Sequence, residues 1–138
     1  MNIKLFIKGI TLITLTIAVI LPNVLLSSEN YDRKSNKENR VRVDVLPVQL
    51  QFNKTIRFDV KMNTHSVKLD NNFLVDSLLI DSEGIEYKPL KWEGTPPGSH
   101  HRSGMLEFPS LTGKPESVTL IIKNVSNVPK RIYQWKIK

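Results

Sequence analysis

The chain has 138 residues, a net charge of +7 from 20 basic and 13 acidic side chains, and no cysteine. Its 40% hydrophobic and 24% charged residues exclude an intrinsically disordered protein. The missing cysteine excludes disulfides, thiolate metal sites and cysteine nucleophiles. Ala18 is the only alanine, so the strongest helix former is absent from the rest of the chain, which favours β structure.

Residues 1–26 have the layout of a signal peptide or signal anchor. Two lysines near the start precede an apolar run over residues 9–26. As a helix this run would reach roughly 27 Å, close to the bilayer core of about 30 Å, and residues 5–8 can lengthen it. Residues 25–28 make a poor cleavage site, so both alternatives stay open. Either the chain is a single-pass protein of the cell membrane, held through residues 5–26 with its C-terminal domain outside, or it is secreted.

A polar linker and one domain follow this leader. Residues 27–40 mix charges and contain a single aromatic residue, which is typical of a flexible tether. Residues 41–138 form the predicted domain, with a net charge of +4. Its basic residues are dispersed, and the longest run is Lys130-Arg131, so no nucleic-acid partner is expected.

The domain alternates apolar and polar residues with the period of a β-strand. Residues 55–62 show this best, because Ile56, Phe58, Val60 and Met62 fall on one face. Further strands are expected over residues 42–45, 48–52, 77–80, 85–91, 105–108, 117–123 and 131–137. Seven or eight short strands in this length predict an all-β fold, an immunoglobulin-like antiparallel β-sandwich whose core contains Trp92 and Trp135.

One loop differs from ordinary connecting sequence. Residues 92–108 read WEGTPPGSHHRSGMLEF, in which two prolines and three glycines favour a bent path with few conformations. Long structured loops on a β-sandwich often carry the binding function. We therefore expect a ligand-binding surface made of Trp92, Glu93, Pro96, Pro97, His100, His101 and Arg102.

This loop belongs to a wider set of motifs. The chain also contains THSVKLD at residues 64–70 and VPKRIYQW at residues 128–135. Together they resemble a group of small exported prokaryotic β-sandwich proteins with the patterns THSVxLD, WEGxPPGGHHRxGxLxF and VPxRxFxW. The resemblance extends from about Phe58 to the end of the chain, and it departs at Ser99 and Ile132. It implies a fold and an exported location, but no activity.

All three histidines lie in these motifs, at positions 65, 100 and 101. Imidazole is a common ligand of Zn²⁺ and Cu²⁺, so His65, His100 and His101, or two of them with Asp70 or Glu93, form a candidate metal site. Adjacent histidines in an extended chain point in opposite directions, which counts against a site that uses all three. In the structural alternative, one histidine bonds to the loop, and Arg102 pairs with Glu93 or Asp70.

Catalysis lacks its usual signals. Ser66, His65 and Asp70 supply the residue types of a hydrolase triad, but neighbours in sequence seldom have that geometry, and no nucleophile-elbow pattern accompanies them. The sequence therefore predicts a non-enzymatic binding or assembly module outside the cytoplasm, with another extracytoplasmic protein or a cell-envelope component as its partner. The alternative is an exported copper- or zinc-binding protein that uses His65 with His100 or His101.

Overall fold

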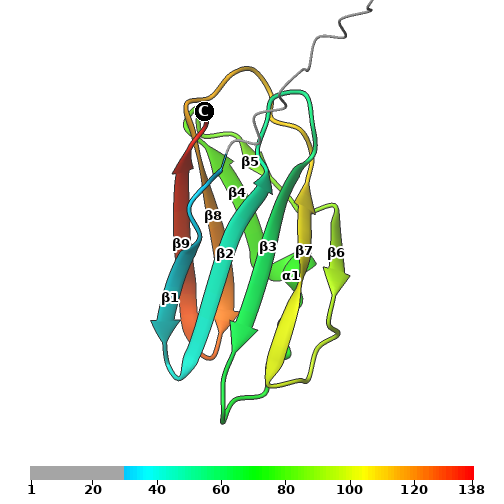
Figure 1. Cartoon of the computed structure of the whole chain (residues 1–138), viewed down its shortest axis with the longest axis vertical. Helices are drawn as coiled ribbons and strands as arrows, with labels where there is room; N and C mark the ends of the chain where they lie inside the picture. The colour runs from blue at the N-terminus through cyan, green and yellow to red at the C-terminus, as the bar shows by residue number, and fades with distance from the viewer. Residues whose placement is uncertain (1–29) are drawn as a thin grey trace, which may run out of the picture.

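The computed structural model describes residues 30–138, which form two antiparallel β-sheets (Figure 1). The first sheet has the order β1-β2-β3-β7-β6, with bounds β1 Lys34–Glu38, β2 Val41–Gln49, β3 Ile56–Asn63, β7 His101–Phe108 and β6 Lys91–Gly94. The second has the order β5-β4-β8-β9, with bounds β5 Glu86–Tyr87, β4 Ser77–Asp81, β8 Ser117–Val125 and β9 Val128–Lys136. A single helical turn, α1 (Phe73–Asp76), lies between β3 and β4 along the chain.

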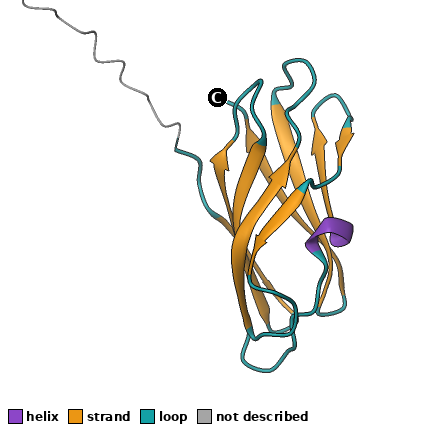
Figure 2. Ribbon diagram, turned by 90° about the vertical axis from the view of Figure 1, so that its right-hand side faces the viewer, coloured by secondary structure: helices purple, strands orange, loops and turns teal. Residues whose placement is uncertain are grey.

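The two sheets share one hydrophobic core. On β3 the four alternating side chains Ile56, Phe58, Val60 and Met62 are all fully buried, as the period-two pattern predicted. Phe58 of the first sheet contacts Trp135 of the second, with ring centroids 5.4 Å apart. The all-β prediction is therefore confirmed, with the two layers visible in the side view (Figure 2).

The N-terminal boundary of the domain differs from the prediction. Residues 34–38 form strand β1 and pair with β2, whereas a flexible linker was expected over residues 27–40. This strand carries no hydrophobic alternation, because it lies at the sheet edge with both faces largely exposed. It is held by backbone pairing and by the buried Arg131, which donates hydrogen bonds to carbonyls of Asn36, Glu38 and Val41. Edge pairing of this kind leaves almost no signature in side-chain polarity.

The predicted leader, residues 1–26, lies outside the described residues. From residue 30 to residue 138 the structure contains no helix long and apolar enough to span a bilayer. The first described residue is close to the C-terminus, because the Lys138 Nζ donates a hydrogen bond of 2.6 Å to the carbonyl of Asn30. These two ends of the described chain share one end of the sandwich, which we call the terminal end (Figure 1).

Candidate functional site

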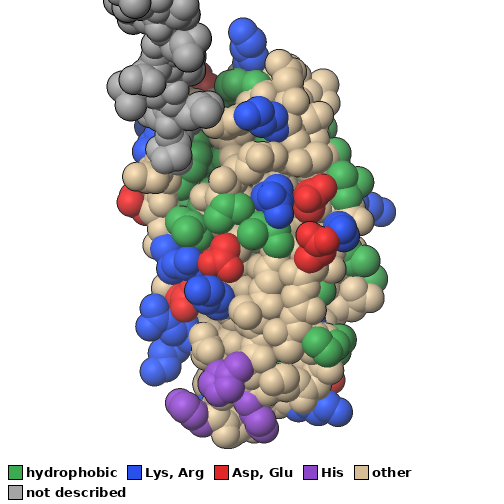
Figure 3. Space-filling view, turned by 45° about the vertical axis from the view of Figure 1, so that its right-hand side comes forward, with side chains coloured by type: hydrophobic (Ala, Val, Ile, Leu, Met, Phe, Trp, Pro, Cys, Tyr) green, Lys and Arg blue, Asp and Glu red, His purple; other side chains and the backbone are tan. Residues whose placement is uncertain are grey.

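The three histidines gather at the end of the molecule opposite the terminal end (Figure 3). We call this region, residues 63–69 and 95–101, the histidine end. Its two segments are joined by backbone hydrogen bonds: the amide of Thr64 donates to the carbonyl of His100 at 3.1 Å, and that of Leu69 donates to Ser99 at 3.2 Å. The amide of Gly98 donates a hydrogen bond of 2.8 Å to the carbonyl of Leu69, so each segment fixes the backbone of the other.

Both adjacent histidines are fixed through the same ring nitrogen. His100 Nδ1 lies 3.0 Å from the carbonyl oxygen of Val67, and His101 Nδ1 lies 2.9 Å from Asn63 Oδ1. Carbonyl oxygens only accept hydrogen bonds, so in the neutral rings Nδ1 carries the hydrogen and is the donor. The other ring nitrogen, Nε2, then keeps its lone pair on both exposed rings.

The structure brings together two of the three histidines. The rings of His65 and His101 lie with centroids 6.5 Å apart and planes at 83°. The chain bends at His100, and the His100 ring turns instead to the carbonyl of Val67. Within residues 30–138 no group of three or more His, Asp and Glu side chains is placed to hold a metal ion.

The Trp92 and Arg102 side chains form a packed cluster beside the loop rather than a recognition surface. The Trp92 ring lies 4.1 Å from that of Phe73, and the Arg102 guanidinium lies 4.9 Å from the Phe73 centroid. Arg102 is only 3% exposed and donates to the carbonyls of Asn71 at 2.7 Å and Leu69 at 3.4 Å. Burial lowers the pKa of Arg102, and the nearby Asp70 carboxylate partly opposes this.

The expected ion pair of Arg102 with Glu93 or Asp70 does not form. Glu93 pairs with Lys91 on the exposed face of β6, and the guanidinium of Arg102 donates its hydrogen bonds to backbone carbonyls. Arg102 is buried, whereas Glu93 is exposed and paired with Lys91, so the two side chains lie in different environments. Of the predicted binding surface, the exposed members are therefore Glu93, Pro96, Pro97, His100 and His101, while Trp92 is half-buried.

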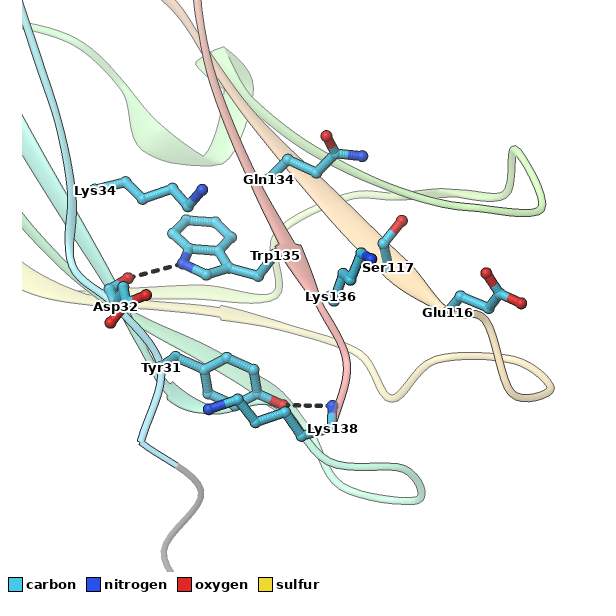
Figure 4. A pocket seen from close by; sticks show the side chains of 9 residues that line it. All are labelled: Tyr31, Asp32, Lys34, Glu116, Ser117, Gln134, Trp135, Lys136 and Lys138. Atoms are coloured by element: carbon cyan, nitrogen blue, oxygen red, sulfur yellow. Dashed lines mark hydrogen bonds between the residues drawn. The ribbon is translucent and has the colours of Figure 1, made fainter.

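A concave region, which the sequence did not indicate, lies at the terminal end. It is a pocket of about 500 Å³ lined by Tyr31, Asp32, Lys34, Glu116, Ser117, Gln134, Trp135, Lys136 and Lys138 (Figure 4). The Trp135 Nε1 donates a hydrogen bond of 2.9 Å to the Asp32 carbonyl, which forms one wall of the pocket. Residues 31–34 were expected to belong to the flexible linker. They pack instead against β9 and form part of the pocket wall, so the sequence pattern did not indicate the pocket.

The comparisons with known proteins give no match. No family model, no curated protein and no solved structure is similar to this chain at a significant level. What the chain does must therefore be inferred from its own residues and their geometry.

Proposed function

We propose that this chain is a non-enzymatic binding or assembly module with an immunoglobulin-like β-sandwich, acting outside the cytoplasm. Residues 5–26 hold it in the membrane, or the chain is secreted after cleavage. Its recognition surface is the histidine end, and its partner is another extracytoplasmic protein or a cell-envelope component. The observation that carries this proposal is the combination of exposed side chains with a fixed backbone in residues 95–101.

Preorganisation is what makes this surface suitable for recognition. Pro96, Pro97, His100 and His101 are exposed, yet the backbone around them is bonded to residues 64–69. A loop held in one conformation loses little entropy when a partner binds, so more of the contact energy appears as affinity. Exposed loops of a rigid β scaffold commonly serve this purpose.

The position of the surface agrees with a tethered module. Tyr31 already packs on the domain, because its hydroxyl donates to the carbonyl of Leu50 at 3.1 Å. If residues 1–26 are the anchor, about four residues remain as tether, which span at most roughly 14 Å. The terminal end then faces the membrane, and the histidine end points away from it towards a partner.

Site-specific photocrosslinking in cells that export the full chain tests this function. A photoreactive amino acid at Pro96 should give one discrete adduct, and the same group at Lys54, on the terminal end, should not. The combined His100→Ala and His101→Ala changes should weaken the adduct without changing the amount of exported protein. Adducts of equal yield from Pro96 and Lys54, or none from Pro96, would refute the histidine end as the recognition surface.

A further inference from the structure

We propose that His65 and His101 form a two-histidine chelate for a divalent first-row transition metal ion, with Cu²⁺ bound most tightly. This inference deepens the proposed function, because it assigns a ligand class to the same histidine end. It starts from the proximity of the two rings, whose centroids lie 6.5 Å apart with the ring planes at 83°. These residues are 36 positions apart in sequence, and the pairing of Thr64 with His100 is what joins their segments.

The position of the His101 ring is set by strand pairing. Asn63 and His101 are direct partners in the β3–β7 register, and Asn63 Oδ1 accepts the hydrogen bond from the Nδ1 of His101. This leaves the Nε2 lone pair of an exposed ring available for a metal ion. A histidine ligand that donates its second ring N–H to a carbonyl-type oxygen is the usual arrangement in protein metal sites.

The other ligand sits on a fixed turn. Thr64, which is 3% exposed, precedes His65, and its Oγ1 accepts hydrogen bonds of 3.3 Å from the amides of Ser66 and Val67. This side-chain-to-backbone bonding closes a tight turn with His65 inside it. His65 itself is exposed, so its ring can adjust by rotamer while its backbone stays in place.

The donor set decides which metal is expected. Imidazole nitrogen suits copper, nickel and zinc, whereas magnesium and calcium prefer oxygen donors. Between the suitable ions, affinity for a nitrogen site peaks at Cu²⁺. Two imidazoles fill only two coordination positions, so water or a donor from a binding partner occupies the rest. A metal held in this way gives the histidine end an open coordination position for recognition.

His100 provides a matched control for this site. It is also exposed, and its Nδ1 also bonds a carbonyl oxygen, but it faces Val67 rather than the other two rings. The full-length chain in detergent micelles is titrated with Cu²⁺ and with Zn²⁺ against a competing chelator. His65→Ala and His101→Ala should each lower Cu²⁺ affinity at least about tenfold, since even outer partners of a metal ligand contribute that much. His100→Ala should leave the affinity within about twofold.

Spectroscopy gives a second readout that does not depend on variants. Bound Cu²⁺ should broaden the NMR signals of His65, His101 and Asn63 before those of His100, and its electron paramagnetic resonance spectrum should show coupling to two nitrogens. Equal losses of affinity in all three histidine variants, or no difference between wild type and the His65→Ala/His101→Ala double variant, would overturn the proposal. The Pro96 crosslink, measured with a chelator present to remove bound metal, tests the recognition surface independently of the metal site.

Discussion

Gly94 and Gly104 face each other across β6 and β7, and neither position has room for a side chain. A Cβ at Gly94 would lie 2.5 Å from the Cα of Gly104, and one at Gly104 would lie 2.6 Å from the Cα of Gly94. Both would also approach the Cζ2 atom of Trp92 to 2.8 Å. The two glycines therefore leave the space that the Trp92 indole occupies over β6 and β7. The glycines that end the WEG and RSG segments are thus required for packing.

The first prediction concerns this glycine pair. Gly94→Ala and Gly104→Ala should each lower the free energy of unfolding by about 1–3 kcal/mol, because the added methyl meets backbone atoms that cannot move freely. Urea denaturation followed by tryptophan fluorescence measures the effect. Ser103→Ala is the control, because Ser103 precedes Gly104 on β7 and its side chain is exposed. This change should alter stability by less than about 0.5 kcal/mol. A similar small effect at both glycines would contradict the packing argument.

The second prediction concerns Arg102. Its planar guanidinium reaches the Asn71 and Leu69 carbonyls while lying over Phe73, a geometry that a lysine ammonium cannot reproduce. Arg102→Lys should therefore cost about 1–3 kcal/mol of unfolding free energy, mainly from unsatisfied buried carbonyls. The exposed Arg40→Lys is the matched control and should be neutral. If the two changes have equal effects, the contacts of Arg102 with the Asn71 and Leu69 carbonyls do not stabilise the fold.

The third prediction is a pH dependence centred on Asp81. Burial pushes the pKa of this carboxyl up, but hydrogen bonds from the Tyr87 hydroxyl and from the amides of Ile85 and Glu83 outweigh burial and hold the pKa below 3.8. A pKa lower in the folded than in the unfolded state means that ionised Asp81 stabilises the fold above about pH 4. This stabilisation is lost as the pH falls through the folded-state pKa.

Denaturation midpoints at pH 7 and pH 3 test the role of Asp81. Asp81→Asn should lower stability at pH 7, and its loss of stability on acidification should be smaller than that of the wild type. Glu86→Gln, at an exposed position on β5, should leave the pH 7 midpoint near that of the wild type. An unchanged acid dependence in Asp81→Asn would show that other carboxyl groups dominate.

The fourth prediction concerns the start of the domain. A chain beginning at Val41 lacks β1 and the Asp32 carbonyl that binds the Trp135 indole, and it leaves Arg131 without its partners on Asn36 and Glu38. It should unfold at lower denaturant than residues 30–138, with tryptophan emission shifted to the red in the native state. Hydrogen exchange over β9 should also be faster. Equal stability of the two chains would mean that β1 contributes nothing to the fold.

Much of the fold was predictable because burial leaves a local pattern. The alternation along β3 identified its inward face, and Trp135 is buried as expected. The motif residues pointed to the loop at residues 92–108, whose role in binding stays a prediction. Trp92 shows the limit of this reasoning, because a large aromatic residue was expected in the core, whereas the side chain packs half-buried at its margin on Phe73.

Alternation with period two is a property of neighbouring residues, so the local pattern was enough to predict the all-β class and the inward face of β3. Long-range contacts were needed to make residues 34–38 a strand, to bury Arg102, and to place the ring of His101, not that of His100, near His65. Each of these depends on contacts between residues far apart in sequence. An edge strand, a guanidinium bonded to distant carbonyls and a pair of rings from two loops carry no local signature, because their partners are chosen by the packing of the whole chain.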